Sequence, residues 1–411
     1  MNRAEAEPLT VTIHLPDVEP GQSPAFLKVA GVMVLTRLIL GAMQAGAGKI
    51  IVAGSYADAA RSRCGDDPRL KGRDIRWETS QSRIEKTDIH VDANVVVGNP
   101  VWQLLFECEH PAFVPAAPRM ERTGSSEPDP LWHPDSPTGA YVVPVIEHHD
   151  IKAAKDAIFA NVTKSTSGPI SRNLNSRISI PISRVLCEFG VTPNQMTLVT
   201  TIVGFIGAWF VSRGRLTDVA IGGTLFQLCA ALDRVDGELA RSTFRASPLG
   251  AWIDTVGDNL VYVVFTVCLI IGYQRYTLAH EYAIAGWVLP LGISMVLVML
   301  VLVGGMTWYL VDTRQPGTMT AVHQDLDQKM GTARTNWLFK TLDSLKILGK
   351  RDSFSFVVFL LSIAPVIMGT PVGYHLLFWI SMAGILFISI HFTMAMAISR
   401  KHVSTVVNHE R

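Results

Sequence analysis

The chain has 411 residues, and its 36 Lys and Arg against 35 Asp and Glu leave a formal net charge of +1. This balance gives no electrostatic reason to expect a nucleic-acid partner. Hydrophobic residues make up 48% and charged residues 17% of the chain, with a mean hydropathy of +0.28, which excludes a disordered protein and favours a membrane protein. The five cysteines show no CxxC spacing and are odd in number, so neither a zinc knuckle nor a disulfide framework is expected.

Residues 1–160 have the patterning of a soluble α/β domain. Strands alternate with helices, which predicts a parallel, Rossmann-like sheet. The expected strands are residues 11–15, 49–53, 92–97 and 141–146, and the expected helices are residues 33–44 and 151–162. The segment 115–138 is rich in proline and polar residues and is expected to be a loop.

Charged residues become scarce after residue 189, where membrane-spanning helices are expected. The N-terminus lacks the order of a signal peptide, so we expect insertion through internal segments. Three uncharged runs are long enough to span, given that a spanning helix needs ~20 residues. They are residues 189–212, 282–311 and 353–399, the last holding two helices broken at 368–371.

Two shorter uncharged runs, 219–232 and 259–274, reach spanning length only by including neighbouring carboxylates. The sequence therefore predicts six transmembrane helices, with four Asp residues at the edge of the membrane, where each unpaired charge costs several kcal/mol. The four are Asp233, Asp236, Asp254 and Asp258.

The distribution of basic residues predicts the orientation. Seven Lys and Arg lie in the loop 312–352, whereas the loops expected on the opposite side hold three Arg. By the positive-inside rule, we expect a multi-pass protein of the cytoplasmic (inner) membrane with both termini in the cytoplasm. The expected domains are a cytoplasmic α/β domain at 1–160, an interfacial amphipathic helix at 161–188, a six-helix transmembrane domain at 189–400 and a cytoplasmic tail at 401–411.

The four Asp residues lie on two helical faces that can meet. Helical spacing places one set of residues on the second transmembrane helix and another on the third. The first set is Asp233, Asp236, Gly237, Ala240 and Arg241, and the second is Gly250, Asp254 and Asp258. Consecutive helices joined by a short turn are antiparallel neighbours, so four carboxylates would converge, which requires cations between them.

Oxygen-only ligands favour Mg²⁺, Mn²⁺ or Ca²⁺ over zinc, and two such ions can hold a diphosphate while an oxygen displaces part of it. The small residues would leave space for a nucleotide, although Gly and Ala at such spacing also serve close helix packing. Alternative interpretations of the carboxylates are helix caps or the ion pathway of a transporter. Their position near one membrane surface argues against transport.

The pattern Asp-x2-Asp-Gly-x2-Ala-Arg-x8-Gly-x3-Asp-x3-Asp resembles the signature of the CDP-alcohol phosphotransferase family. The resemblance implies a six-helix membrane enzyme that moves a phosphoalcohol from a CDP-alcohol to an acceptor hydroxyl and releases CMP. It implies two Mg²⁺ or Mn²⁺ ions held by Asp233, Asp236 and Asp254. Asp258 would be a metal neighbour and the catalytic general base. The nucleotide site would be lined by Gly237, Ala240, Arg241 and Gly250.

Other segments are similar to the same family. Residues 192–197 (Thr-Pro-Asn-Gln-Met-Thr) resemble its TPNQxT pattern, and Lys350-Arg351-Asp352 resembles a further feature, for which stop-transfer charge is an equal alternative. The stretch 168–184 alternates basic and apolar residues, as in an interfacial helix or in a solvated charged helix. Candidates for acceptor or phosphate contacts are Arg172, Arg177, Arg245 and Asn194.

The fusion of an α/β domain to this signature resembles bifunctional inositol-phosphate cytidylyltransferase and di-inositol-phosphate-phosphate synthase proteins, with a nucleotidyltransferase-like front domain. A nucleotidyltransferase needs a glycine-rich loop for the triphosphate, and nothing before Phe26 supplies one. It also needs an Asp after a hydrophobic strand, where this chain has Asn99. We therefore expect a front domain without cytidylyltransferase activity. Nucleotide binding, docking of a partner and stabilisation of the membrane domain are left open as its role.

The resemblance leaves the substrates open. The donor is a CDP-alcohol, and the acceptor is a polyol phosphate, such as inositol phosphate, or a lipid; a CDP-diacylglycerol donor with a soluble alcohol or alcohol-phosphate acceptor is the alternative. Membrane lipids are expected partners, and a homodimer is left open. The alternative of a different class is a catalytically silent membrane scaffold or transporter.

Overall fold

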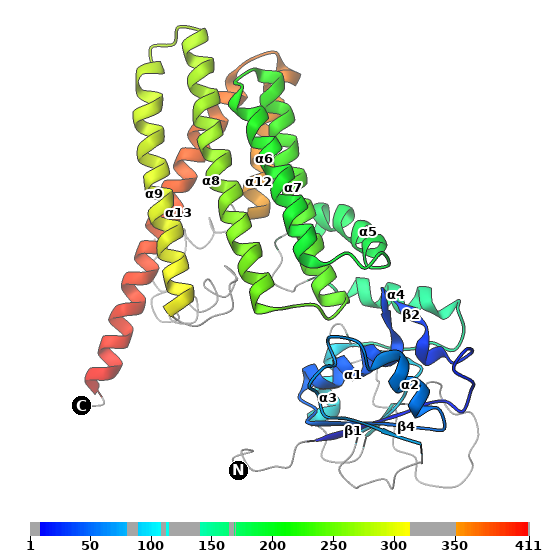
Figure 1. Ribbon diagram of the computed structural model, residues 1–411. Coiled ribbons are helices and arrows are strands. Elements are labelled where there is room, and N and C mark those ends of the chain that lie inside the picture. Colours follow the sequence, from blue (N-terminus) through cyan, green and yellow to red (C-terminus); the bar gives the residue numbers. More distant parts are fainter. Residues whose placement is uncertain are drawn as a thin grey trace. The chain divides into compact units, whose positions relative to one another are not determined.

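The computed structural model describes residues 9–79, 89–107, 112–114, 140–163, 168, 170–312 and 351–409. The chain divides into two compact units. An α/β unit comprises residues 1–164, 184–190 and 241–245, and a helical unit comprises residues 165–183, 191–240 and 246–411 (Figure 1). The predicted loop 115–138 lies outside the described residues. So do residues 313–350, which hold most of the Lys and Arg used to predict the membrane orientation.

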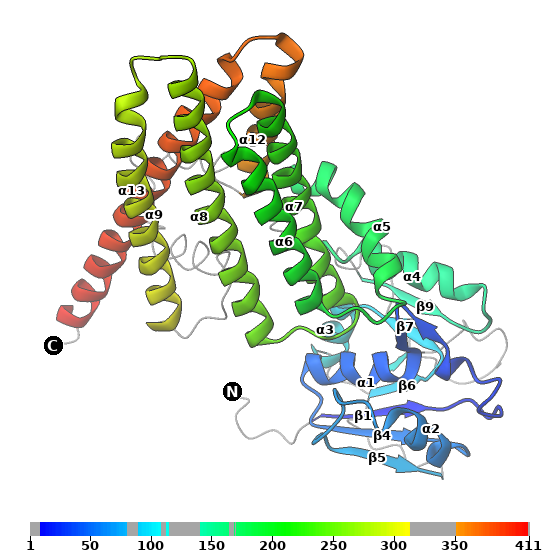
Figure 2. The ribbon, with the colours of Figure 1, turned by 45° about the horizontal axis from the view of Figure 1, so that its top comes forward.

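The α/β unit is built on a five-stranded parallel sheet, as predicted. Its order is β5-β4-β1-β6-β8, and each neighbouring pair is parallel. Figure 2 shows the strands side by side, with α1 lying along one face. The strands are β1 (Thr10–His14), β4 (Lys49–Ala53), β5 (Ile75–Glu78), β6 (Ile89–Asp92) and β8 (Ala112–Val114).

The single strand predicted at 92–97 is wrong. β6 ends at Asp92, and β7 (Val95–Val97) pairs antiparallel with β9 (Val142–Pro144) in a separate two-stranded sheet. A turn at Ala93 and Asn94 divides the run, and Asn94 O accepts from the Val145 N–H group at 2.7 Å. The valines favour strands on both sides of the turn, which is why the residue pattern reads as continuous.

Apolar side chains of the sheet and its helices form one core. Val11 and Ile13 of β1 are fully buried, and they share the core with Leu38 of α1 and Trp102 of α3. The helices of the unit are α1 (Val34–Ala45), α2 (Ala57–Cys64), α3 (Asn99–Glu107) and α4 (Asp150–Ala160). A short 3-10 helix, η2 (Pro24–Phe26), precedes the hairpin of β2 (Lys28–Val29) and β3 (Val32–Met33).

The helical unit contains the predicted membrane helices. Among the described residues, five helices are long and apolar enough to cross a membrane, which makes this a multi-pass membrane protein. They lie in α6 (Pro193–Ser212), α7 (Leu216–Ser242), α8 (Pro248–Ala279), α9 (Ala285–Asp312) and α13 (Val372–His409). The fifth predicted helix is present as α12 (Arg351–Met368), a shorter apolar helix that is not among these five. A π-helical turn η3 (Ser171–Asn175) leads into α5 (Ser176–Leu186).

Small residues let these helices approach closely, as membrane helices require. A Cβ atom on Gly207 would lie 3.0 Å from Gly222 O, and one on Gly272 would lie 2.1 Å from Val211 O. α6 therefore packs tightly against α7 and α8, the two helices that carry the predicted Asp residues.

Candidate metal centre

Three carboxylates of the signature converge. Asp233 and Asp236 lie on the last turns of α7, and Asp254 lies on the second turn of α8. Each offers a carboxylate oxygen, and these oxygens all lie within 4.8 Å of one another. Asp236 is buried, whereas Asp233 and Asp254 are half-buried. The predicted meeting of the two helical faces is therefore present for these three residues.

The N-terminus of α6 holds Asp236 in place. Thr192 caps the helix by accepting from the Gln195 N–H group, and the Gln195 side chain accepts from the Thr192 N–H group. Thr197 then donates its hydroxyl to Asp236 Oδ2 at 2.7 Å, and the Gly237 N–H group also bonds Asp236. The segment 192–197, noted in the sequence only for its resemblance, thus begins the helix and orients a carboxylate. The sequence reasoning missed the role of Thr197.

Asp258 stands outside this group of three. It lies one helical turn beyond Asp254 on α8 and is half-buried. A turn advances the chain by about 5.4 Å, so the two carboxylates sit at different levels of the helix. Its predicted function as a general base stays a prediction.

The small residues lie beside the three carboxylates. Ser247 caps α8 by accepting from the Gly250 N–H group at 3.0 Å. A Cβ atom on Gly250 would lie 3.2 Å from Asn194 Oδ1, so the structure brings together two of the predicted contact residues. Gly237 and Ala240 are half-buried on α7.

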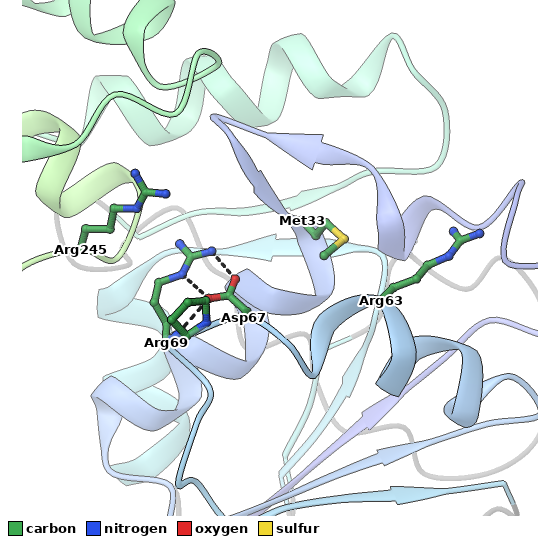
Figure 3. A pocket seen from close by; sticks show the side chains of 6 residues that line it. Met33, Arg63, Asp67, Arg69 and Arg245 are labelled. Atoms are coloured by element: carbon green, nitrogen blue, oxygen red, sulfur yellow. Dashed lines mark hydrogen bonds and ion pairs between the residues drawn. The ribbon is translucent and has the colours of Figure 1, made fainter.

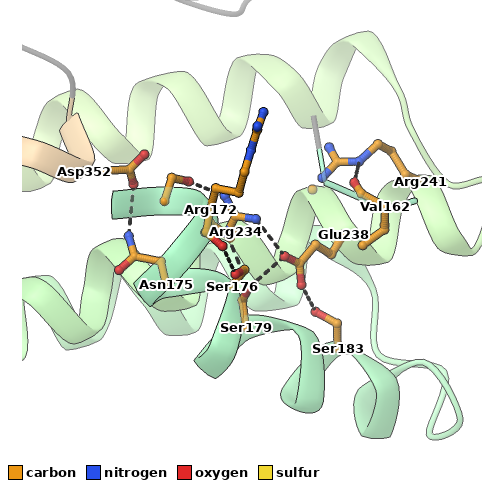
Figure 4. A network of polar contacts seen from close by, with 12 residues as sticks. Val162, Arg172, Asn175, Ser176, Ser179, Ser183, Arg234, Glu238, Arg241 and Asp352 are labelled. Atoms are coloured by element: carbon orange, nitrogen blue, oxygen red, sulfur yellow. Dashed lines mark hydrogen bonds and ion pairs between the residues drawn. The ribbon is translucent and has the colours of Figure 1, made fainter. Parts of the chain in front are cut away.

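The arginines predicted to contact the nucleotide, the acceptor or a phosphate are exposed or bond backbone carbonyls. Arg172 and Arg177 are exposed on η3 and α5. Arg241 donates from Nε to Val162 O at 2.8 Å (Figure 4). Arg245 donates to Gly190 O at 3.0 Å, and both bonds lie within the α/β unit.

A buried polar network lies on another face of α7. Glu238 is fully buried and accepts from Ser179 and Ser183 of α5, each at 2.7 Å. Arg234, one turn before it, lies 3.4 Å from the same carboxylate and bonds Ser171. Figure 4 shows these side chains meeting between the two helices. The sequence reasoning missed this network because Arg234 and Glu238 occupy unspecified positions of the signature.

The network continues to the start of α12. Gln227 of α7 donates to Asn175 Oδ1 at 2.9 Å, and Asn175 donates to Asp352 Oδ1 at 3.1 Å. The inward face of η3 and α5 is thus polar, whereas Leu174 and Ile178 are 39% exposed on the outward face. α7 is therefore held on one side by α5 while it presents Asp233 and Asp236 on another.

The donor set fits a hard divalent cation. Three carboxylates this close repel one another unless a cation or a proton intervenes. Carboxylate oxygens are the ligands that Mg²⁺ and Mn²⁺ prefer. The three residues could therefore hold a metal ion.

Comparison with known proteins finds a family match for part of the helical unit. Residues 190–336 match the sequence model of the CDP-alcohol phosphatidyltransferase family. The chain is 42% identical over 113 residues to a bifunctional IPC transferase and DIPP synthase of Thermococcus kodakarensis, which covers 27% of this chain and 25% of that protein. It is 35% identical over 133 residues to the protein of the same name from Aquifex aeolicus, covering 32% and 30% of the two chains.

A third relative has a name that describes a different activity. The chain is 30% identical over 97 residues to a CDP-diacylglycerol–inositol 3-phosphatidyltransferase of Drosophila melanogaster, covering 24% of this chain and 42% of that one. The matches thus span a quarter to less than half of the length of these relatives. Residues 190–336 form a domain of the CDP-alcohol phosphatidyltransferase family, a family that generally uses divalent metals.

Proposed function

We propose that this protein is a membrane-embedded CDP-alcohol phosphotransferase that works in phospholipid or polyol-phosphate synthesis. The observation that carries the proposal is the convergence of Asp233, Asp236 and Asp254 within 4.8 Å, on two helices that bear the whole signature of the family. Three converging carboxylates suit a metal-assisted displacement at a diphosphate.

Asp233, Asp236 and Asp254 would hold two Mg²⁺ or Mn²⁺ ions, which when bound neutralise the diphosphate of the donor. The acceptor hydroxyl oxygen attacks the phosphorus that carries the donor alcohol. The bond from that phosphorus to the CMP oxygen breaks, and CMP leaves with the bonding electron pair. Asp258 takes the proton of the hydroxyl, as the general base.

The nucleotide would lie against Gly237, Ala240 and Gly250, because side chains at these positions would fill the space beside the carboxylates. Arg241 would contact a phosphate of the nucleotide after release of Val162 O.

The acceptor class is proposed from the relatives. Two of them carry names for inositol-phosphate chemistry and a third is an inositol phosphatidyltransferase. We infer an acceptor or donor group of the inositol or polyol-phosphate class, with Arg172, Arg177 and Arg245 as the cations for its phosphate and CDP-diacylglycerol as the alternative donor. The α/β unit would have no cytidylyltransferase activity.

We further propose the predicted arrangement in the inner membrane. Six helices would cross it, with α12 as the shortest, and both termini would lie in the cytoplasm. The low burial of α9 supports its contact with lipid, because only 17% of its apolar span is buried. The protein would act as a monomer or a homodimer among its lipids.

The test is release of CMP by the purified full chain in lipid vesicles. Two donors are supplied separately, CDP-diacylglycerol and a CDP-linked inositol, each with inositol phosphate as the acceptor and Mn²⁺ present. The proposal predicts CMP and a new phosphodiester with one donor. If the protein is instead a silent scaffold or a transporter, no CMP is released with either donor, although the protein is still inserted in the vesicles.

A further inference from the structure

We propose that the α/β unit positions the metal centre by holding the segment Arg241–Arg245 in the middle of the signature. This segment comprises the last two residues of α7 and the first three residues of the connection to α8. This inference rests on the proposed function for its catalytic consequence. In this proposal the α/β unit contributes to the transferase reaction by positioning residues, without itself acting on a nucleotide.

The segment belongs to the α/β unit by its contacts. Ser242 and Thr243 are 2% and 4% exposed, and Phe244 packs against the hydrophobic core of that unit. Phe244 has a φ of +57°, a left-handed conformation that a bulky residue adopts at a cost of roughly 1–2 kcal/mol. Packing of its partly buried ring against the core offsets this cost, so the α/β unit specifies the conformation of the segment.

Arg37 of α1 makes the deepest contact with the segment. Its guanidinium donates to Val29 O at 2.8 Å, to Ala30 O at 3.1 Å and to Ser242 O at 2.7 Å. The guanidinium carbon also lies 5.7 Å from the centre of the Phe244 ring. A planar guanidinium can hold several carbonyls at once in a fixed geometry, which a lysine cannot do.

The chain around Arg37 is shaped for this contact. Ala30 and Gly31 have φ angles of +49° and +73°, which turn the hairpin between β2 and β3 and direct two carbonyls at the guanidinium. Burial lowers the pKa of Arg37 to about 10, so the residue stays charged at neutral pH. The site is therefore built around a permanent cation that binds carbonyl oxygens.

A second arginine, Arg69, binds the backbone carbonyl of the next residue, Thr243. Arg69 donates to Thr243 O at 2.5 Å, and Asp67 accepts from Arg69 Nε at 2.8 Å. Figure 3 shows Asp67 fixing Arg69 while Arg245 lies across the same pocket. Arg245 is itself tied to Gly190 O. Two consecutive carbonyls of the segment are thus bound by arginines of the α/β unit.

The segment lies in the chain between the metal-binding carboxylates of α7 and α8, so its conformation affects their geometry. Asp236 lies on the helix that enters the segment, and Asp254 lies on the helix that leaves it. Catalysis requires these carboxylates in one geometry, and a shift of about 1 Å from a remote mutation can cost about 10²-fold in rate. Arg37, Arg69 and Phe244 are therefore positioning residues.

The test compares variants of the full chain in lipid vesicles. Phe244→Ala and Arg69→Met remove the grip. Leu105→Ala truncates a fully buried core residue of the same unit that lies outside the segment, and Arg63→Ala removes an exposed arginine of the same pocket. Three quantities are measured: Mn²⁺ affinity without substrate by electron paramagnetic resonance, hydrogen exchange of residues 247–254, and kcat for CMP release.

The inference predicts that Phe244→Ala and Arg69→Met weaken Mn²⁺ binding, speed exchange at the start of α8 and lower kcat about 10- to 100-fold. Leu105→Ala and Arg63→Ala should leave all three unchanged. Phe244→Leu, which keeps an apolar side chain in the core, should recover most of the loss.

Two results would overturn the inference: unchanged exchange at 247–254 in both grip variants, or equal effects of Leu105→Ala and Phe244→Ala on all three quantities. Failure of the proposed function is distinguishable, because wild-type protein would then release no CMP while the exchange comparison still gives its answer.

Discussion

The hydroxyl of Thr197 on α6 donates to Asp236 Oδ2 on α7 at 2.7 Å, across two helices that are joined by a turn at their far ends. Thr197 is 6% exposed, and its hydroxyl also lies 3.2 Å from Pro193 O of its own helix. The bond restrains the Asp236 carboxylate, whose other oxygen accepts from the Gly237 N–H group.

Thr197→Val keeps the size of this side chain but removes the donor. Loss of such a partner of a metal ligand typically weakens metal binding about 10- to 100-fold. We therefore expect the Mn²⁺ concentration needed for half-maximal CMP release to rise by about that factor, while the amount of folded protein stays the same. Thr197→Ser, which keeps the hydroxyl, is the matched control. Wild-type Mn²⁺ dependence in Thr197→Val would show that Asp236 needs no orientation.

Asp258→Asn tests the proton acceptor. A general base typically contributes ~10² to 10⁴ in rate, so kcat should fall by that factor while binding of the CDP-alcohol is retained. Binding is measured by equilibrium dialysis with a labelled donor, and turnover by CMP release. Asn259→Ala is the control at the next position, where the side chain donates to Thr255 O of its own helix. Parallel loss of binding and turnover would make Asp258 a metal ligand.

Glu238→Ala tests the buried network between α5 and α7. The substitution leaves Arg234 buried without this carboxylate, and breaking a buried ion pair typically costs about 3–5 kcal/mol. We expect a clearly lower melting temperature in detergent. Arg234→Met combined with Glu238→Met removes both charges and should recover much of the stability. Ser176→Ala, on the same helix as Ser179, should have little effect. A wild-type melting temperature for Glu238→Ala would contradict a stabilising network.

Two histidines of the sheet give the α/β unit a pH-dependent stability. His14 and His90 stack and share a hydrogen bond of 2.9 Å, and burial lowers the pKa of each below 6.5, while Asp92 partly opposes this for His14. Below pH 6.5 the unfolded chain then binds more protons than the folded unit, so the free energy of unfolding falls as the pH decreases. Above pH 6.5 this contribution is constant.

Hydrogen exchange of β1 measures this effect between pH 7.5 and 5, after correction for the intrinsic rate. We expect progressively weaker protection below pH 6.5 in wild-type protein and a flatter profile in His90→Phe. His149→Gln, on an exposed histidine, should follow the wild type. An identical profile in wild type and His90→Phe would exclude this histidine as the source.

The sequence predicts the helical faces of the site because the period of a helix is fixed locally. Asp233 and Asp236 fall on one face and Asp254 on another, and two antiparallel helices bring them together. The same rule places Asp258 on the face of Asp254 but one turn away, and it does not say at which level of the helix the carboxylates meet. That level depends on how the helices pack, and the bond from Thr197 of α6 to Asp236 is one such contact.

Long-range contacts account for what the sequence could not predict. Arg241 follows the face of Asp233, yet its side chain bonds Val162 O, nearly eighty positions earlier in the chain. Arg37 reads as part of an apolar helix, and nothing near it in sequence indicates that it binds Ser242 O. Such partners depend on how distant segments pack, whereas residue patterns report only local geometry.

The central claim is that Asp233, Asp236 and Asp254 hold the divalent metal that the transferase needs. The most direct measurement is Mn²⁺ binding together with CMP release in lipid vesicles by wild-type protein, by Asp254→Asn and by Asp218→Asn, a carboxylate at the opposite end of α7. We expect tight Mn²⁺ binding and CMP release in wild type and Asp218→Asn, and loss of both in Asp254→Asn or in EDTA. Undiminished CMP release by Asp254→Asn, or by wild-type protein in EDTA, would contradict the account.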